Sequence, residues 1–415
     1  MSSSNSTEDY SESSSSDDEY YGDNGEIFYN EVLNKKYITI KKIGYGAYSS
    51  VWLCMDYLTN KFYAIKIQNS EDYKDGILER NILNKLKLYN NKYTSNLIES
   101  FIEVIDKEKY ICLVFELCAC NLYSLIKKKY NFGLNDIKKI TKQLFLSLYD
   151  LHELEYYHTD IKPENILLNG IGDDIQNILN NYTNYNSVYK TLKEKIFEKK
   201  NFNLKNKNHL KKFNKKYKED LLRQTNKIFI DKLNINNSSS EEDDNSFNIS
   251  DKFLKDNLNI KLTDYGTVHD IEHGYYNTIS TRYYRAPEVI LGLVHNEKVD
   301  IWSIGCVVLE LLTNEIFFNP KKDKEYIRDF YHLLDIQKYC GKLPEYMINK
   351  SPDKRLFFSK KNKFKMEIDY SSLKDYLIKK DLYSDELLEF LNHTLNIDYK
   401  KRLSAHDCLK LKWLN

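Results

Sequence analysis

Two glycines lie close together in the stretch Ile43-Gly44-Tyr45-Gly46-Ala47-Tyr48-Ser49-Ser50-Val51. Glycine lets a backbone approach a phosphate group closely, and successive backbone amides can donate hydrogen bonds to it. A dinucleotide-binding fold would need a helix directly after the glycines, whereas SSVWLCMDY is typical of a strand. The sequence also lacks the GxxxxGKS or GxxxxGKT motif of a P-loop. The stretch therefore predicts either an ordinary β-turn or a glycine-rich nucleotide loop.

A lysine follows in the apolar run Ala64-Ile65-Lys66, fifteen residues after Val51. A lysine on such a strand can place its ammonium against the α- and β-phosphates of a nucleotide when a helix glutamate holds it there. Glu79 is the expected glutamate, because the apolar residues that follow it would face the core beside it. An edge-strand lysine without a ligand is the alternative for Lys66 taken alone.

The segment HTDIKPEN, from His158 to Asn165, fits the pattern H-x-D-x-x-x-x-N of the protein kinase catalytic loop. By this resemblance Asp160 would accept the proton of the substrate hydroxyl and Lys162 would steady the γ-phosphate of ATP. Asn165 would hold Mg²⁺. The tripeptide that begins at Asp264, DYG, fits the DFG element, in which Asp264 would be the main Mg²⁺ ligand.

Further elements follow in the order that protein kinases share. Ala286-Pro287-Glu288 fits the APE element, and Asp300 opens the next apolar helix. The chain therefore resembles a eukaryotic-type protein kinase. This resemblance implies an α+β bilobal fold, with a small β-rich N-lobe, a larger helical C-lobe and ATP in the cleft between them, and it implies ATP and Mg²⁺ as cofactors.

The same resemblance assigns roles to residues outside these motifs. Glu116 and Cys118 would offer backbone groups to the adenine of ATP, behind a gatekeeper Phe115. Ala64 would line the nucleotide site together with the glycine-rich stretch 43–51. Arg402, in DYKKRLS, would pair with the glutamate of the APE element, a bidentate task that lysine cannot perform.

Among kinases, TRYYRAPE with Arg285 looks like the CMGC group. The segments GYGAYSSVWLC and HTDIKPENILL, with a long insert after the second, resemble the SR-protein kinases most closely. LAMMER-type kinases share the HTD loop, but their namesake motif is missing. The chain departs from the SR-kinase pattern at Tyr265, at the Ala286-Pro287 pair and in the lysines of 321–325, and the last departure bears on substrate docking.

The activity implied by the resemblance is transfer of the ATP γ-phosphate to serine or threonine hydroxyls of protein substrates. Glu164 would lie near the residues just before the phosphoacceptor, where a carboxylate favours a basic neighbour. Arg-flanked serines, and hence Arg/Ser-rich proteins, are the expected substrates. The alternatives are a proline-directed CMGC kinase, which Arg285 favours, and a catalytically weak pseudokinase scaffold.

Two further positions bear on regulation and on metals. Thr159 stands where most kinases carry an arginine that binds a phosphate on the activation loop, so we expect activity without phosphorylation of Thr278 or Tyr276.

The sequence His269-Asp270-Ile271-Glu272-His273 matches the HxxEH pattern of zinc proteases. That pattern needs a stable helix, whereas this one lies in the expected activation segment, which favours a solvated loop or histidines that face the substrate.

The periodicity of the apolar residues changes along the chain. Strands are expected over 36–43, 49–57, 61–67, 97–105 and 110–115, with a helix over 76–88. Ile137, Ile140, Leu144, Leu148 and Leu151 then recur at helical spacing. We therefore expect the N-lobe over 37–118 and the C-lobe over 119–415.

Two segments are expected to lie outside this folded core. The first 26 residues hold nine serines and eight acidic residues, so 1–30 is expected to be a disordered, acidic, Ser-rich tail. Residues 169–259 are charged and Asn-rich, without sustained periodicity, and are expected to be a mostly disordered insert, with at most a transient helix, that interrupts the C-lobe.

Composition narrows the remaining possibilities. The chain has 62 Lys+Arg against 61 Asp+Glu, and this balance argues against a dedicated nucleic-acid binder. No apolar stretch approaches the roughly 20 residues that a transmembrane helix needs, so no membrane association is expected. Seven cysteines without a CxxC pair predict buried, reduced thiols in a cytosolic or nuclear protein. The expected location is cytoplasmic, with passage to the nucleus. A monomer is expected.

Overall fold

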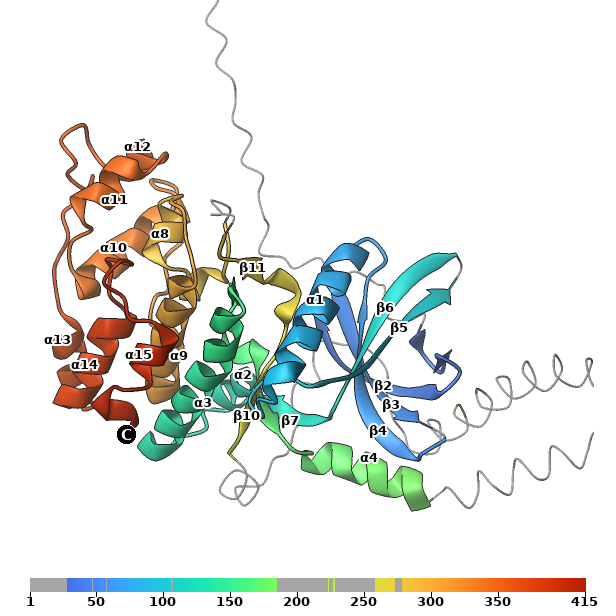
Figure 1. Ribbon diagram of the computed structural model, residues 1–415. Coiled ribbons are helices and arrows are strands. Elements are labelled where there is room, and N and C mark those ends of the chain that lie inside the picture. The colour runs from blue at the N-terminus through green and yellow to red at the C-terminus, as the bar shows by residue number, and fades with distance from the viewer. Residues whose placement is uncertain are drawn as a thin grey trace, which may run out of the picture.

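The computed structural model describes residues 28–46, 48–56, 58–105, 107–184, 223, 227, 258–272 and 278–415. These residues form two lobes, a β-rich lobe from the first part of the chain and a helical lobe from the later part (Figure 1). The prediction of an α+β bilobal fold is confirmed. Within the described ranges, none of the helices has both the length and the apolar character that crossing a bilayer requires.

The smaller lobe is built on a six-stranded antiparallel sheet. In spatial order its strands are β1 (Val32–Leu33), β2 (Tyr37–Gly46), β3 (Ser49–Asp56), β4 (Lys61–Gln68), β6 (Glu108–Phe115) and β5 (Leu97–Ile105). Side chains alternate across a strand, so Ile65 and Ile67 are buried on one face of β4 while Lys66 points to the other. The five expected strands coincide with β2 to β6 within a few residues.

Helix α1 (Tyr73–Leu86) packs on this sheet and carries Glu79. Its buried face includes Ile82, Leu83 and Leu86. A side chain at Gly76 would clash with Ile111 of β6, so glycine at this position lets the helix approach the sheet closely. Glu79, about one turn later, is buried on the same side of the helix.

The larger lobe is mainly helical. Its helices are α2 (Leu122–Lys127), α3 (Leu134–Glu153), α8 (Pro287–Ile290), α9 (Lys298–Thr313), α10 (Arg328–Cys340), α11 (Glu345–Lys350), α12 (Lys354–Phe357), α13 (Leu373–Lys379), α14 (Asp385–Thr394) and α15 (Ala405–Cys408). Short strands form two small sheets beside them: β7 (Cys118–Asn121), β9 (Ile166–Asn169) and β10 (Ile260–Leu262) in one, β8 (Tyr156–Tyr157) and β11 (His269–Asp270) in the other.

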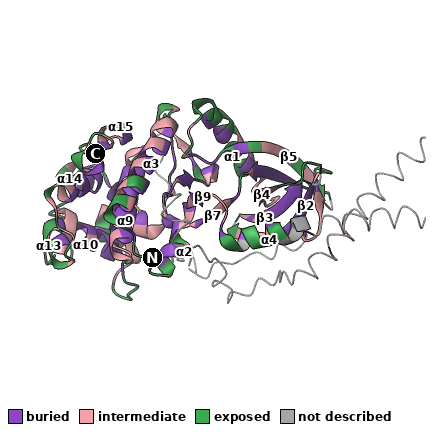
Figure 2. Cartoon of the chain, turned by 90° about the horizontal axis from the view of Figure 1, so that it is seen from below, coloured by how far each residue is buried: buried purple, intermediate pink, exposed green. Residues whose placement is uncertain are grey.

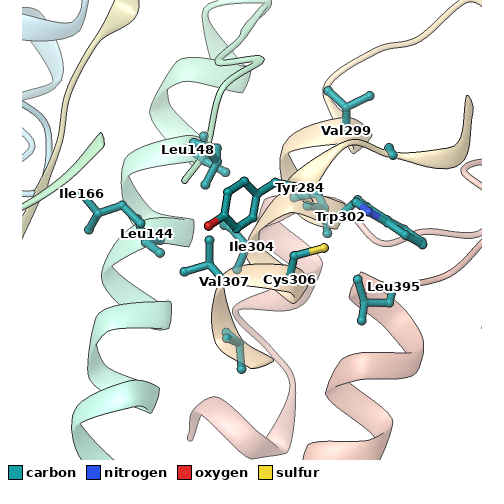
Figure 3. Close-up of a cluster of buried hydrophobic side chains, with 14 of the residues drawn as sticks. Leu144, Leu148, Ile166, Tyr284, Val299, Trp302, Ile304, Cys306, Val307 and Leu395 are labelled. Carbon is teal, nitrogen blue, oxygen red and sulfur yellow. The ribbon is translucent and has the colours of Figure 1, made fainter. Parts of the chain in front are cut away.

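The core of the helical lobe lies between α3 and α9. Figure 3 shows Leu144 and Leu148 of α3 facing Ile304 and Val307 of α9, with the Tyr284 ring between the two helices. All five side chains are buried. Burying one such apolar side chain contributes about 1.5–3 kcal/mol, so this pair of helices is a rigid base for the loops at its ends.

A buried ion pair fastens the C-terminal part of the chain to this base. The two terminal nitrogens of Arg402 lie 2.6 and 3.0 Å from the two carboxylate oxygens of Glu288. The same guanidinium donates to the carbonyls of Asn396 and Lys298. A planar guanidinium can make all these bonds at once and an ammonium cannot, which explains an arginine here in a chain that otherwise favours lysine.

Helix α4 (Asp173–Asn184) lies within the segment 169–259 that we expected to be mostly disordered. Ile175 and Leu179 are only 4% and 7% exposed, because they pack against a cluster that includes Ile38, Leu53 and Leu117. Figure 2 shows the exposed side of α4 in green next to the sheet. The expectation was wrong for these twelve residues, since a short amphipathic helix finds an apolar sheet face to cover. Apart from Arg223, Lys227, Leu258 and Asn259, the rest of 185–259 lies outside the described residues.

The boundary of the expected tail also needs correction. Phe28 is buried and meets Tyr110 edge to face at a ring-centroid distance of 5.1 Å. The Thr39 hydroxyl donates to the Phe28 carbonyl at 2.7 Å. Residues 28–30 therefore belong to the folded lobe, and residues 1–27 of the predicted tail lie outside the described residues.

Truncating the buried face of α4 should destabilise the protein. We expect Ile175→Ala and Leu179→Ala each to lower the free energy of unfolding by about 2 kcal/mol, because each leaves a gap against the sheet. Asn177→Ala, on the exposed side of the same helix, is the matched control and should change little. Urea denaturation measures all three, and equal midpoints for the buried and exposed variants would contradict this packing.

Candidate active site

The Lys66 ammonium is the centre of the cleft between the lobes. It lies 2.8 Å from Glu79 Oε2 and 2.7 Å from Asp264 Oδ1, although these residues are far apart in the sequence. Its side chain is only 14% exposed. Burial opposes the charge, but the carboxylates of Asp264 and Glu79 outweigh it and raise the pKa of Lys66. The ammonium in turn lowers the pKa of Asp264, so a charged cluster is held in the cleft.

The catalytic-loop residues meet around the Asp160 carboxylate. Lys162 Nζ lies 2.8 Å from Asp160 Oδ2, and the Asn165 amide nitrogen donates to the same oxygen at 3.2 Å. The other oxygen accepts from the backbone amide and the hydroxyl of Thr281, at 3.0 and 2.9 Å. Thr281 was not identified from the sequence, because a threonine between the activation segment and the APE element carries no distinctive signal.

Asp300, the second residue missed as a site residue, holds the backbone of this loop. Its two carboxylate oxygens accept from the amides of His158 at 2.7 Å and Thr159 at 2.9 Å. Thr159 has a φ of 72°, in the left-handed region that β-branched residues rarely adopt. The two hydrogen bonds stabilise that conformation. A lone acid at the start of an apolar helix was the signal that could have identified Asp300.

The glycine-rich stretch forms a β-hairpin at the edge of the cleft. Gly44 pairs with Val51, Tyr45 with Ser50 and Gly46 with Ser49. Tyr45 and Tyr48 are exposed, and Ile43 packs against the apolar cluster that α4 completes. Ala47 lies outside the described residues. The hairpin leads directly into strand β3 and not into a helix, as the hypothesis of a glycine-rich nucleotide loop requires.

The expected adenine contacts lie where the chain passes between the lobes. Ala64 of β4 pairs in register with Phe115 at the end of β6. Glu116 follows, and its exposed side chain lies 3.7 Å from Lys261 Nζ. Cys118 begins β7 and pairs with Asn169. The backbone at 116–118 therefore lies between the sheet that carries Lys66 and the sheet that follows the catalytic loop.

Neutral hydrogen bonds attach the activation segment to the catalytic loop. The Thr159 hydroxyl donates to the Thr267 carbonyl at 2.8 Å, and the Ser280 hydroxyl donates to the Thr159 carbonyl at 2.6 Å. One residue of the catalytic loop thus holds both ends of the segment. Thr278 is exposed, and Tyr276 lies outside the described residues.

The HxxEH pattern does not form a zinc site within the described residues. His269 and Asp270 form strand β11, which pairs with Tyr156 and Tyr157 of β8, so the helix that this pattern needs is missing there. His273 lies outside the described residues. Across the ranges that the structure describes, no group of three or more His, Cys, Asp or Glu side chains could hold a metal ion.

The residues expected to hold Mg²⁺ suit a cation that is shared with phosphate. Asp264 offers carboxylate oxygens, and Asn165 donates from its nitrogen to Asp160, so its amide oxygen is the atom it can offer to a cation. Mg²⁺ prefers such hard oxygen ligands and commonly uses one or two of them together with substrate phosphates. The donor set therefore fits Mg²⁺ bound with a nucleotide.

Comparison with known proteins agrees with this geometry. The family model of the protein kinase domain matches residues 37–178 and 248–414. A protein of Acanthamoeba polyphaga mimivirus whose name describes a serine/threonine-protein kinase is 30% identical over 478 residues, covering 92% of this chain and 88% of its own length. The serine/threonine-protein kinase SRPK of Physarum polycephalum is 28% identical over 397 residues, covering 92% and 86%.

A third relative, the dual specificity protein kinase CLK1 of Homo sapiens, is 26% identical over 394 residues, covering 92% of this chain and 66% of its own length. The predicted resemblance to CMGC kinases of the SR-protein kinase type is confirmed by these SRPK and CLK relatives. Because the family model spans both lobes and the relatives align over nine-tenths of the chain, this chain belongs to the protein kinase family.

Proposed function

We propose that this kinase phosphorylates serines that have an arginine beside them. The observation that carries the proposal is the Glu164 carboxylate of the catalytic loop, which interacts with Lys162 and has the buried Glu310 nearby. Glu164 would bind a substrate guanidinium while Asp160 acts on the neighbouring serine hydroxyl, and the charge of Glu310 would add to the attraction.

The transfer itself would follow from the groups around Asp160. Lys162 and Thr281 hold the carboxylate in place, so it can accept the hydroxyl proton as the oxygen attacks the γ-phosphate. Lys66 would neutralise charge on the α- and β-phosphates while Glu79 keeps it in position. Bound Mg²⁺ supplies further neutralisation of phosphate charge at Asp264 and Asn165. Because all these groups converge, we favour an active kinase over the pseudokinase scaffold.

Glu310 of α9 is 2% exposed and accepts from the Tyr284 hydroxyl at 2.7 Å. Burial raises the pKa of Glu310 to about 7, the Tyr284 hydrogen bond opposes this rise, and the nearby Glu164 charge adds to it. Two acids that repel each other favour a cation between them. Glu164 is partly exposed and also interacts with Lys162, so it would make the direct contact with a substrate arginine.

One observation favours the rival, proline-directed preference. Arg285 Nε donates to the Ile279 carbonyl and Arg285 Nη2 donates to the Ser280 carbonyl, both at 3.0 Å. Ser280 has a φ of 65°. With these carbonyls occupied, the segment would have fewer acceptors for a substrate amide after the phosphoacceptor, and proline lacks that amide. The two preferences are separable with matched peptides.

The remaining expectations stay proposals. We propose protein substrates that include Arg/Ser-rich sequences, with no direct nucleic-acid contact, and a monomer in solution. We also propose a cytoplasmic location with passage to the nucleus. Direct measurement of mass in solution and of cellular distribution would test them.

Replacing Asp160, the proposed catalytic base, should abolish phosphate transfer. We expect Asp160→Asn to lower kcat by about 10²–10⁴-fold while ATP binding persists, because the carboxylate acts on the substrate hydroxyl. Asp369→Asn, an exposed acid remote from the cleft, is the matched control. Radiolabelled phosphate transfer onto a basic protein measures the rate. More than about a tenth of the wild-type rate in Asp160→Asn would contradict the assignment.

Activity should not depend on phosphorylation of the activation segment. The Thr159 and Ser280 hydrogen bonds hold the segment without a phosphate, so phosphatase treatment should change kcat by less than about twofold. Mass spectrometry verifies that the phosphate has been removed, and a mock-treated sample is the control. A loss of about tenfold or more would show that a phosphate completes the site.

The substrate preference can be tested with three peptides that differ only beside the serine. We expect higher kcat/KM for Arg-Ser than for Ala-Ser or Ser-Pro, and we expect Glu164→Gln to raise KM for Arg-Ser about tenfold, which corresponds to loss of a charged hydrogen bond. Because Glu310 ionises near pH 7, KM for Arg-Ser should also fall as pH rises from 6 to 8.

Glu389→Gln, an exposed acid on α14, is the control for this charge change and should leave every KM unaltered. An equal or higher kcat/KM for Ser-Pro would overturn the arginine preference and support the proline-directed alternative. The kinase assignment would stand in either case.

A further inference from the structure

Tyr265 occupies the middle of the element that carries Asp264, where the common kinase pattern has phenylalanine. The residue is 1% exposed and opens the short 3₁₀ turn η4 (Tyr265–Thr267). Its ring packs edge-on against the His158 ring at a centroid distance of 5.2 Å. A phenylalanine would fill the same volume, so the phenol oxygen is the feature that needs an explanation.

The Tyr265 hydroxyl lies in a small polar cluster within the apolar core. It donates to the Leu262 carbonyl of β10 at 3.3 Å. The Thr94 and Ser147 hydroxyls lie 3.0 Å from each other and both interact with the phenol oxygen. Burial raises the pKa of the phenol and these two hydroxyls oppose the rise, so all three oxygens share one buried network.

The network joins three different parts of the fold. Thr94 lies between α1 and β5, Ser147 is on α3, and Leu262 is on β10. The Ser95 amide also donates to the Leu262 carbonyl, at 2.9 Å. These contacts, together with the parallel bridge between Thr94 and Leu262, bring the three parts together around the phenol oxygen.

The backbone of Tyr265 connects this cluster to the charged site. Its amide donates to the Glu79 carboxylate, and the preceding residue, Asp264, contacts Lys66. Asp264 has a φ of 69°, a left-handed conformation that an aspartate adopts at some cost. A side-chain contact at position 265 is therefore well placed to stabilise that conformation.

We propose that the Tyr265 hydroxyl, bound by Thr94, Ser147 and the Leu262 carbonyl, is a polar latch that keeps Asp264 directed at Lys66. Tyr265 acts as a positioning residue, since it acts through Asp264 and Glu79. This inference rests on the proposed phosphoryl transfer at this site. In an alternative state the Tyr265 ring would be withdrawn and Asp264 turned away. The wild-type protein should visit that state less often than the Tyr265→Phe variant.

The latch is best measured through the minor state. When the withdrawn state is rare, a tenfold rise in its population hardly lowers kcat, whereas the apparent affinity of a ligand that binds only that state rises by the full factor. We choose as probe a diaryl urea with an aryl group that would need the volume that the residue-265 ring fills. Removing one neutral buried hydrogen bond corresponds to about a three- to tenfold change in the equilibrium.

We therefore expect Tyr265→Phe to bind the diaryl urea about three- to tenfold more tightly than wild type. Tyr346→Phe is the matched control, because it removes a hydroxyl that donates to Asp398, remote from the cleft. It should leave the affinity for the urea unchanged. A general loss of stability would not produce this selective gain.

A double-mutant cycle identifies the partners of the phenol. In a Thr94→Val, Ser147→Ala background, the further change Tyr265→Phe should alter the urea affinity by less than twofold, because the receptor for the phenol is already weakened. A Tyr265→Phe effect equal to that of Tyr346→Phe would overturn the latch, and so would an undiminished effect in the double-variant background. Failure of the proposed substrate preference is separate, because the kcat/KM values of the peptides report it and the affinity for the urea does not.

Discussion

The Lys66 ammonium, held between two carboxylates, is the constraint on which the arrangement of the two lobes depends. Each of its partners comes from a different layer: β4 supplies the lysine, α1 supplies Glu79 and the segment after β10 supplies Asp264. A charge this poorly exposed to water is costly unless it is paired. Any movement that separates α1 from the sheet, or withdraws Asp264, leaves an unpaired charge in the cleft. The ion pairs are therefore stable only while the sheet, α1 and the activation segment keep these relative positions.

Uncharged hydrogen bonds attach the activation segment to the catalytic loop, because Thr159 bonds to both ends of the segment. The backbone of the loop is held in turn by the Asp300 carboxylate, which accepts from two consecutive amides. A hydroxyl donating to a carbonyl keeps its strength over the whole physiological pH range, unlike a phosphate–arginine contact that a phosphatase can remove. The activation segment is thus attached at Thr159 by neutral contacts, whereas buried carboxylates hold the catalytic loop and, through the Arg402–Glu288 pair, the C-terminal part of the chain.

The sequence was most informative where chemistry or periodicity is local. Motif spacing predicted that Asp160 and Asn165 share one site, where their side chains do meet, and the alternation of apolar residues predicted β4 with Lys66 in it. Asp300 and Thr281 were not assigned to the site, because their roles arise from contacts more than a hundred residues away in sequence. Helix α4 was missed for a related reason. Twelve residues with few apolar side chains do not predict a stable helix by themselves, and only the exposed apolar face of a distant sheet makes that helix favourable.

This last point links the insert to the nucleotide site. Helix α1 covers one part of the sheet face that carries Lys66, and without α4 another part of that face would expose Ile38, Leu53 and their neighbours. Ile43 of the glycine-rich hairpin and Ala64 of β4 pack against the same cluster. The apolar contacts that fasten α4 to the sheet are therefore continuous with those that support the hairpin over the cleft. Close-packed side chains transmit displacement rather than absorb it, so the position of α4 and the position of the hairpin are mechanically coupled.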